Sequence, residues 1–362
     1  MSGRPILVMA GGTGGHVYPA LAVANALQQQ SQNIVWLGTR RGIEAKVIPA
    51  AGIDIEWISI HGLRGKGILT LLLAPFRLCL ALLQSISVMV RHRPAAVLGM
   101  GGFVSGPGGL AAWLTRRPLV IHEQNAVAGL TNRLLARLAR VVLQAFPGSF
   151  PAGIEAETVG NPVRAEIAAI DEPAQRFEKR SGAIRLLVLG GSQGALALNR
   201  VVPEALKLLP ENRRPVVRHQ AGQHTLQTAL DGYEGSGIDA DVTPYIEHMA
   251  EAYAWADLVV CRAGALTVAE IAAAGLAAVF VPFPAAVDDH QTKNSRPMQD
   301  AGAADLLQER DLSAETLARL LTGLTESREA LQQRAIRSRT LAQPQALARI
   351  TGVCLDAAGV SS

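Results

Sequence analysis

The same order of segments occurs twice in this chain, and this repetition constrains its fold more than any other feature. Near the start, the apolar run 6–9 leads into the glycine-rich stretch AGGTGG and then into a helical pattern, VYPALAVANALQQQ. Residues 184–206, IRLLVLGGSQGALALNRVVPEAL, repeat that order. A buried strand, a glycine turn and a helix form one βα unit. We therefore predict an α/β protein with two doubly wound, Rossmann-like domains that face each other across a cleft.

Further short apolar runs extend the pattern through both halves of the chain. They begin at Ile34, Ala96, Leu119, Leu258 and Ala278. Turn residues cluster in the stretch GNPV at 160–163, which places the boundary there and gives domains 1–163 and 164–343. We expect the final helix, within 344–362, to pack back on the first domain.

Composition narrows the class of protein and the kind of ligand. The chain has 362 residues, a net charge of +4 and a pI near 9.2, which suits phosphate ligands or an anionic membrane surface. This basic excess is too weak and scattered for a nucleic-acid-binding protein. The three cysteines, Cys79, Cys261 and Cys354, lie far apart and form no CxxC, so we expect a reducing compartment and no zinc site. With no leader pattern at the N-terminus, we expect a cytoplasmic location.

The first glycine turn has the features of a phosphate or sugar site. Gly11, Gly12, Gly14 and Gly15 lack a Cβ atom, so their amides can approach a ligand closely. The helix that follows points its N-terminus at the same place, which favours negative charge. The alternative for one turn alone is that these glycines only permit a tight turn. The second turn at 190–194 and a third glycine stretch, GMGGFVSGPGG at 99–109, favour a cleft lined by backbone.

Two familiar phosphate motifs fail on spacing. A dinucleotide fingerprint starting at Gly12 needs glycine at position 17, which is Val17, and the turn at 190–194 does not match it either. A Walker A loop ending at Lys66 needs glycine at Ile60 and Ser or Thr at Gly67. The sequence therefore gives no support to hydride transfer or to nucleoside-triphosphate hydrolysis.

Longer stretches resemble one family over nearly the whole chain. The chain is similar to the MurG family, the membrane-associated glycosyltransferases of peptidoglycan synthesis. The stretches that carry the resemblance are GGTGGHVYPALAVANAL, HGLRGKG, GMGGFVSGPGGLAAW, HEQNAVAGLTNRLLA, VGNPVR, LGGSQGA, YAWADLVVCRAGALTVAEIAAAGL and VPFPAAVDDHQTKN.

The resemblance implies the GT-B fold and a specific inverting reaction. Members move N-acetylglucosamine from UDP-N-acetylglucosamine to the 4-hydroxyl of the muramoyl sugar of lipid I (undecaprenyl-pyrophosphoryl-muramoyl-pentapeptide), which gives lipid II. It also implies a peripheral location on the cytoplasmic face of the inner membrane, contact with anionic lipids, and other cell-wall synthesis proteins as partners. Neither a cofactor nor a metal is implied.

The resemblance assigns site residues position by position. The C-terminal domain binds the donor, with Arg164 and Ser192 on the diphosphate, the backbone of Ile246 on uracil and Glu270 on the ribose hydroxyls. The family commonly has two glutamines where this chain has His290 and Gln291, so only Gln291 is carried over, as a contact to the sugar. The remaining implied contacts are Thr13, Gly14, Gly15, Asn125, Ala265, Leu266, Thr267, Val268 and Ala269.

A general base must take the proton of the acceptor hydroxyl. His16 is our candidate, because an ordinary imidazole can accept a proton at neutral pH. The alternative, that His16 only donates to a phosphate or holds the turn, has equal weight. His122 and Glu123 are the second choices, although a lone histidine at a strand end is more often structural.

Residues 68–90, ILTLLLAPFRLCLALLQSISVMV, have the length of a membrane span. Pro75 and Arg77 make a spanning helix the minority interpretation, and a buried core helix is a second alternative. We favour an exposed apolar patch with basic neighbours that docks on an anionic leaflet, with Leu72, Leu73 and Phe76 as contacts.

Functions of other classes remain open on the residues alone. Another nucleotide-sugar transferase would share the fold, and so would an epimerase that acts on UDP-N-acetylglucosamine. A regulatory protein that binds a UDP-sugar without turnover is the non-enzymatic alternative.

Overall fold

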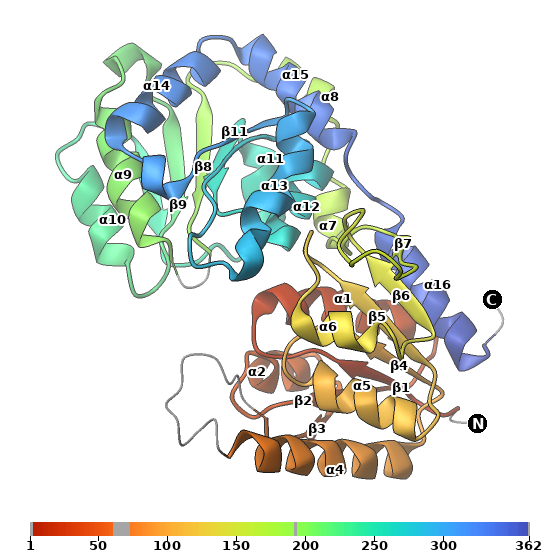
Figure 1. Cartoon of the computed structure of the whole chain (residues 1–362). Helices are drawn as coiled ribbons and strands as arrows, with labels where there is room; N and C mark the ends of the chain where they lie inside the picture. The colour runs from red at the N-terminus through yellow and green to blue at the C-terminus, as the bar shows by residue number, and fades with distance from the viewer. Residues whose placement is uncertain (1–2, 61–72, 192–193, 361–362) are drawn as a thin grey trace. The chain divides into compact units, whose positions relative to one another are not determined.

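The structure, a computed structural model, describes residues 3–60, 73–191 and 194–360. The chain divides into two compact units (Figure 1). The N-terminal unit comprises Met1–Pro162 together with Gln345–Ser362, and the C-terminal unit comprises Val163–Pro344. The observed boundary lies one residue before the expected one, and each unit is described by itself below.

The N-terminal unit is built on a parallel sheet of seven strands in the order β3-β2-β1-β4-β5-β6-β7. Its central strand β1 pairs in parallel with β2 and β4. The strands are β1 (Ile6–Met9), β2 (Ile34–Gly38), β3 (Asp54–Trp57), β4 (Ala96–Gly99), β5 (Leu119–Glu123), β6 (Val141–Gln144) and β7 (Glu157–Thr158). The helices are α1 (Gly14–Gln29), α2 (Glu44–Ala50), α4 (Ala74–His92), α5 (Ser105–Leu114), α6 (Leu130–Leu135) and α16 (Ala346–Ala358).

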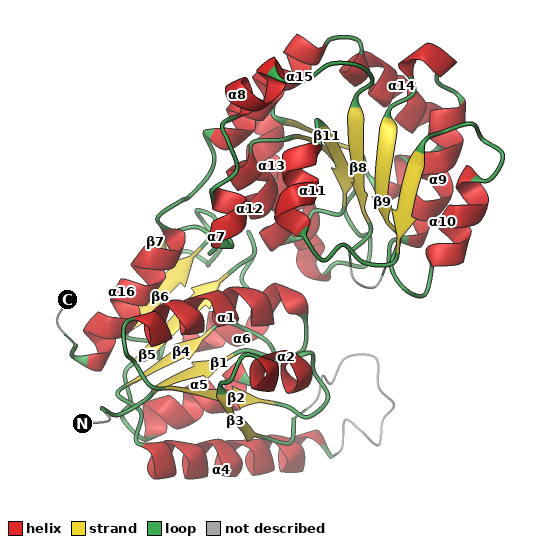
Figure 2. Ribbon diagram, turned by 180° about the vertical axis from the view of Figure 1, so that it is seen from behind, coloured by secondary structure: helices red, strands yellow, loops and turns green. Residues whose placement is uncertain are grey.

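Both faces of this sheet are covered, which explains the continuous apolar runs seen in the sequence. Alternate residues of β1 point to opposite faces, so Ile6 and Val8 pack with α1, α2 and α16, whereas Leu7 and Met9 pack with α4, α5 and α6. All four side chains are fully buried. The sheet therefore separates two cores, and Figure 2 shows it between its helical layers.

The C-terminal helix α16 belongs to the N-terminal unit. It packs against α1, β4 and β5, and Ile350, Val353 and Cys354 are buried in the core that α1 shares. An ion pair on the surface adds to this contact, with Arg349 Nε 2.6 Å and Nη2 2.9 Å from the two carboxylate oxygens of Glu157. The last helix thus completes a domain whose other elements precede residue 163.

The C-terminal unit repeats the architecture with a parallel sheet of six strands in the order β10-β9-β8-β11-β12-β13. Its strands are β8 (Arg185–Leu189), β9 (Val216–Gln220), β10 (Ala240–Thr243), β11 (Leu258–Cys261), β12 (Ala277–Phe280) and β13 (Ala304–Leu306). Its helices are α7 (Ala165–Ala168), α8 (Pro173–Glu178), α9 (Leu196–Lys207), α10 (Leu226–Tyr233), α11 (Met249–Trp255), α12 (Ala265–Ala274), α13 (His290–Asp300), α14 (Ala314–Thr325) and α15 (Arg328–Arg339).

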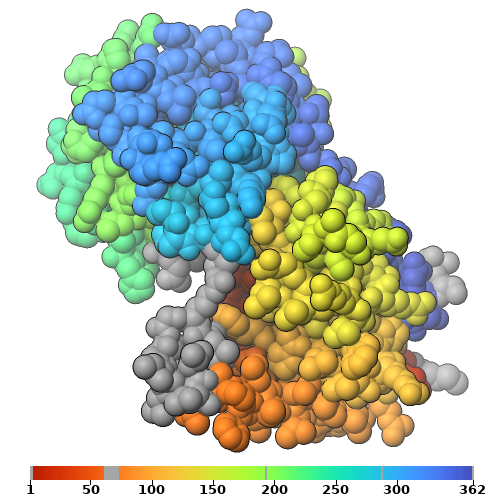
Figure 3. Space-filling view, in the orientation of Figure 1, coloured from red at the N-terminus to blue at the C-terminus, as the bar shows by residue number. Residues whose placement is uncertain are grey.

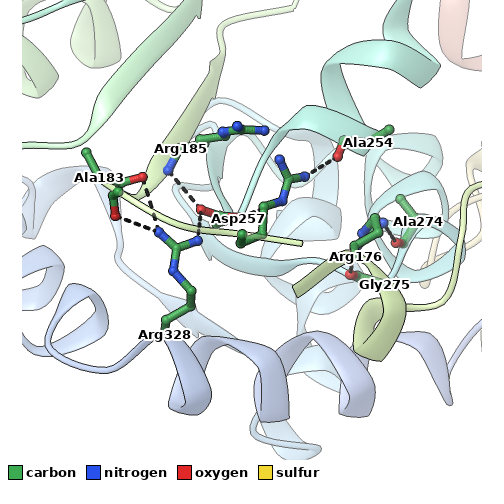
Figure 4. A network of polar contacts seen from close by, with 10 residues as sticks. Arg176, Ala183, Arg185, Ala254, Asp257, Ala274, Gly275 and Arg328 are labelled. Carbon is green, nitrogen blue, oxygen red and sulfur yellow. Dashed lines mark hydrogen bonds and ion pairs between the residues drawn. The ribbon is translucent and has the colours of Figure 1, made fainter. Parts of the chain in front are cut away.

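A buried carboxylate ties the start of this sheet to its helices. Asp257 is fully buried, and its Oδ2 accepts from the backbone N of Arg185 at 3.0 Å and from Arg328 Nη1 at 2.8 Å, as Figure 4 shows. Arg176 caps α12 by donating to the carbonyls of Ala274 and Gly275. These charges are buried with partners, as buried charges must be. The network holds α8, α12 and α15 around the end of the sheet that lies away from the glycine turn.

Candidate functional site

The strand order of each unit determines where a ligand binds. In the first sheet β2 and β3 lie on one side of β1, and β4 lies on its other side. In the second sheet β9 and β10 lie on one side of β8, and β11 lies on its other side. Each sheet therefore has a switch point beside its first strand. Open α/β sheets bind ligands beyond the carboxyl ends of the strands at that point. The turn 11–15 follows β1 and residues 100–104 follow β4, while residues 190–191 follow β8 and residues 262–264 follow β11. The glycine segments of the sequence therefore lie at the two switch points.

The first glycine turn is held by a carboxylate that the sequence analysis did not identify. Glu44, at the start of α2, is fully buried, and its Oε2 accepts from the backbone N of Gly12 at 2.9 Å. Its Oε1 accepts from the backbone N and the hydroxyl of Thr39, at 3.0 and 2.7 Å. A Cβ atom at Gly11 would lie only 2.7 Å from that carboxylate, so a larger residue there would displace it.

The third glycine stretch has two different roles, which corrects the expectation that all of it lines a cleft. Gly101 and Gly102 have positive φ angles of 93° and 80°, and a Cβ at Gly102 would collide with the carbonyl of Gly11. The first and third glycine segments thus touch backbone to backbone. Gly108 and Gly109 instead lie inside α5, where a Cβ would meet Met9 and Leu135. Those two glycines permit close helix packing.

His16 lies in the first turn of α1 and is joined to the end of β5 through Gln124. His16 Nδ1 is 2.9 Å from Gln124 Oε1, and Gln124 Nε2 is 3.1 Å from His122 Nδ1. His122 Nε2 lies 2.9 Å from the carbonyl of Gly160. His122 is fully buried, and this burial lowers its pKa to about 4. With both ring nitrogens engaged inside the protein, His122 is disfavoured as the general base.

The other second choice, Glu123, organises the loop that follows β5. Its buried carboxylate accepts from the backbone N of Asn125 at 3.0 Å and of Gly129 at 3.2 Å. Asn132 Nδ2 donates to the same carboxylate at 2.9 Å, and Asn125 Nδ2 does so at 3.2 Å. With both carboxylate oxygens accepting from this loop, Glu123 positions Asn125 and is disfavoured as the base.

In the C-terminal unit the structure pairs two residues that the sequence analysis assigned to different parts of a nucleotide. Arg164 donates to Glu270 Oε1 from Nε at 3.2 Å and from Nη2 at 2.9 Å. Tyr253, which the sequence analysis missed, donates its hydroxyl to Glu270 Oε2 at 3.1 Å. Burial raises the pKa of the Glu270 carboxyl although Arg164 acts in the opposite direction. The pair places a positive group beside a negative one in the middle of α12.

The other predicted donor residues of this unit that the structure describes lie around the same end of its sheet. Residues 265–269 form the first turns of α12, with Gly264 in extended conformation at the N-cap. Gln291, in the first turn of α13, accepts through Oε1 from the backbone N of Ala263 at 3.2 Å and of Phe283 at 2.9 Å. This leaves the amide nitrogen of Gln291 as its donor toward a ligand. Ile246 is half-buried in the loop between β10 and α11, and Ser192 lies outside the described residues.

The predicted apolar surface is the outer face of α4. Ala81, Val88 and Met89 join the core, while Phe76 is 76% exposed and Leu83 is 64% exposed. Leu73 is exposed just before the helix, and Leu72 lies outside the described residues. Within the described chain α4 alone is long and apolar enough to cross a membrane, which is weak evidence for a span. In Figure 3 this helix forms the orange surface at the lower edge.

Comparison with known proteins decides the family. Residues 6–144 match the Glycosyltransferase family 28 N-terminal domain, and residues 185–350 match its C-terminal domain. A protein of Alkalilimnicola ehrlichii is 57% identical over 98% of this chain and 99% of its own length. It is named UDP-N-acetylglucosamine--N-acetylmuramyl-(pentapeptide) pyrophosphoryl-undecaprenol N-acetylglucosamine transferase. The chain belongs to this family of N-acetylglucosamine transferases.

Solved structures agree with this assignment and separate it from its rivals of the same fold. The crystal structure of Acinetobacter baumannii MurG is 42% identical to the chain, with a TM-score of 0.85 over 98% of this chain and 99% of that one. A UDP-GlcNAc 2-epimerase from Neisseria meningitidis superposes with a TM-score of 0.66, over 97% of this chain and 99% of that one, at only 12% identity, which shows a shared fold alone. The predicted GT-B fold of two parallel α/β domains is confirmed.

Proposed function

We infer that this chain transfers N-acetylglucosamine from UDP-N-acetylglucosamine to the 4-hydroxyl of the muramoyl sugar of lipid I, with inversion, to give lipid II. The observation that carries this conclusion is the 57% identity, over nearly its whole length, to a transferase named for that reaction. The two switch points support it, because both carry glycine turns and helix N-termini suited to phosphate and sugar groups.

The C-terminal unit binds the donor in this proposal. The N-terminus of α12 and the guanidinium of Arg164 supply positive potential for the diphosphate, while Glu270 accepts from the ribose hydroxyls. Because a carboxylate has about four lone-pair positions, Glu270 can accept these hydroxyls while Tyr253 stays bonded. Arg164, whose side chain is 41% exposed, is free to turn from Glu270 to the diphosphate when UDP arrives.

The N-terminal unit binds the acceptor and supplies the base. His16 takes the proton of the acceptor hydroxyl as the oxygen forms its bond to the anomeric carbon. The bond from that carbon to the diphosphate breaks on the opposite side, and UDP leaves with the electron pair. We propose that this reaction needs no metal, because the leaving charge is met by the helix N-terminus and by Arg164.

The protein comes to its lipid-linked acceptor at the membrane. The outer face of α4 carries exposed Phe76 and Leu83, with the exposed cation Arg77 beside them. Apolar side chains with neighbouring basic residues suit shallow insertion into an anionic leaflet. We therefore propose a peripheral location on the cytoplasmic face of the inner membrane.

The deciding experiment follows labelled N-acetylglucosamine from its UDP donor to a short-chain lipid I analogue, with EDTA present. Labelled disaccharide lipid is the expected product. Product that appears only without EDTA would overturn the metal-free proposal and leave the transferase assignment intact. Donor binding without product would redirect the acceptor assignment, and conversion of the donor sugar without any acceptor would identify an epimerase instead.

A further inference from the structure

We propose that Gln124 is a positioning residue that fixes His16 in the tautomer protonated at Nδ1, so that Nε2 is the atom that accepts the acceptor's proton. The tautomer concerns the N-terminal unit alone and can be tested without turnover. Only the use of Nε2 in transfer rests on the proposed function.

The first constraint comes from the carbonyl of Gly160. It lies 2.9 Å from His122 Nε2, and because a carbonyl only accepts, Nε2 must carry the proton. The buried His122 ring is neutral at pH 7, since burial lowers its pKa to about 4. A neutral imidazole protonated at Nε2 has its lone pair on Nδ1. His122 Nδ1 is therefore an acceptor.

The second constraint orients the amide of Gln124. One end of this amide lies 3.1 Å from His122 Nδ1 and 3.2 Å from the backbone carbonyl of His122. Both of those atoms are acceptors, so this end must be the NH₂ group, and the assignment does not depend on an arbitrary amide orientation. The oxygen of Gln124 is then at the other end, 2.9 Å from His16 Nδ1.

These constraints fix the proton on His16. An amide oxygen only accepts, so His16 Nδ1 must donate, and the lone pair of the neutral ring is left on Nε2. Gln124 is buried, with 1% of its surface exposed, which protects the hydrogen bond from exchange with water. Within the described part of the chain, Nε2 of His16 has no hydrogen-bond partner. The basic nitrogen is thus the one directed away from β5.

The glycine segment after β4 lies against the imidazole ring of His16 and limits the positions that the ring can take. Gly101 has a φ of +93°, and a Cβ atom there would lie 2.6 Å from Nδ1 and 2.8 Å from Cε1 of His16. The imidazole therefore rests against bare backbone on one side while Gln124 holds its Nδ1. During transfer the hydroxyl proton passes to Nε2, and the resulting imidazolium keeps its Nδ1–H bond to Gln124.

Nitrogen-15 NMR of the histidine-labelled full chain tests the tautomer directly, because protonated and unprotonated ring nitrogens have well-separated shifts. His16→Gln and His122→Gln assign the signals. We expect His16 to show a protonated Nδ1 and an unprotonated Nε2, and His122 to show the reverse. His16 protonated at Nε2, or exchanging between both forms, would overturn the proposal.

Gln124→Met links the tautomer to turnover, because methionine has similar length without an amide. We expect the His16 signals to lose the Nδ1–H form, kcat to fall about tenfold or more, and the KM for UDP-N-acetylglucosamine to change less than about twofold. Asn132→Ser is the matched control, since it removes a buried amide that also donates to the His122 carbonyl. That variant should lose stability and keep the His16 tautomer.

The outcomes distinguish the claim about the tautomer of His16 from the claim about its role in transfer. If Gln124→Met does not fold, the spectrum of the unmodified protein still decides the tautomer. If His16 has the expected tautomer but His16→Gln keeps full turnover, the role of Nε2 in transfer fails together with the proposed base. If Gln124→Met changes the tautomer and leaves kcat unchanged, the tautomer has no catalytic consequence and the positioning role fails.

Discussion

At the scale of single residues, one carboxylate gathers hydrogen-bond donors at each candidate site. Glu44 gathers three donors from two loops, and Glu270 gathers a guanidinium and a phenol hydroxyl. Glu44 cannot lose its charge or geometry without leaving backbone donors of the first glycine turn unsatisfied, which costs about 1–3 kcal/mol per group. The two residues differ in what they hold, because Glu44 binds mainly backbone amides and Glu270 binds two side chains.

Glu44→Gln should damage the first glycine turn. The amide NH₂ would face the backbone N–H of Gly12 or of Thr39, so we expect the free energy of unfolding to fall by about 1–3 kcal/mol and kcat to fall with it. Urea unfolding and turnover measure both effects. Glu56→Gln is the control, because Glu56 lies on the edge strand β3 and its partners Arg91 and His92 are partly exposed residues of α4, and such pairs contribute about 0–1 kcal/mol. Equal losses in the two variants would contradict the role of Glu44.

Glu270→Gln should weaken UDP binding while the fold persists. A neutral amide accepts from ribose hydroxyls less strongly than a carboxylate, so we expect Kd for UDP to rise about tenfold, or about 1.4 kcal/mol. Isothermal titration calorimetry with UDP measures this change. Glu204→Gln removes a carboxylate from the exposed pair with Lys207 in the same unit and should leave Kd unaltered. Unchanged UDP affinity in Glu270→Gln would remove this residue from the donor site.

At the scale of elements, the strands were predictable where both of their faces are buried. The central strands β1, β8 and β11 are continuous apolar runs, so their positions follow from the sequence. The edge strand β3 alternates in polarity and β7 has only two residues, so neither was predicted. The glycines inside α5 were misassigned, because a packing glycine and a ligand-facing glycine look identical until the neighbouring helix is placed.

The sequence suggested candidate site residues only where a motif or the family resemblance carries them, and their roles stay predictions. Thr13 to His16 lie at the start of α1 and residues 265–270 at the start of α12, so each set lies in one helix that follows a strand. Gln124 and Glu44 escaped notice because their partners are distant in sequence. Gln124 bonds His16 across 108 positions, and Glu44 bonds Gly12 across 32 positions. No local spacing encodes those contacts.

The outer face of α4 should govern attachment to membranes. We expect the double variant Phe76→Asp and Leu83→Asp to lose most binding to vesicles that contain anionic lipid, because it removes exposed apolar surface and adds negative charge. Co-sedimentation with such vesicles measures this, and raised salt should weaken the binding of the unmodified protein. Leu208→Asp changes an exposed leucine of the C-terminal unit, with 56% of its surface accessible, and is the control. Undiminished binding of the double variant would exclude α4 as the docking surface.

At the scale of the whole molecule, the chain uses one architecture twice and gives each copy different chemistry. Both sheets share the same order around their first strand, and both have a glycine turn at the switch point. The N-terminal copy has an imidazole after its turn, and the C-terminal copy has an ion pair beside α12. Each copy also buries one neutral histidine beside its central strands, His122 in the first and His219 in the second.

These two histidines predict acid sensitivity in both units. Burial lowers the pKa of each to about 4, against about 6.5 in an unfolded chain. Between pH 6.5 and 4 the unfolded state therefore binds more protons than the folded state, so the free energy of unfolding falls as pH falls. Each histidine lowers the free energy of unfolding by about 3 kcal/mol as the pH falls from 6.5 to 4. The Glu157 carboxylate, whose pKa Arg349 lowers, acts in a lower window, below pH 4.5.

Urea unfolding of the full chain at several pH values between 7.5 and 4.5 tests this expectation. His219→Gln should reduce the dependence of stability on pH in the C-terminal unit, because glutamine can still donate to Asn199 but does not titrate. Tyr233→Phe is the matched control, since it removes the other partner of His219 and leaves the histidine buried. Tyr233→Phe should lower the free energy of unfolding at every pH, and the dependence of that free energy on pH should stay the same. If the free energy of unfolding of His219→Gln depends on pH as strongly as that of the unmodified protein, other groups cause the acid sensitivity.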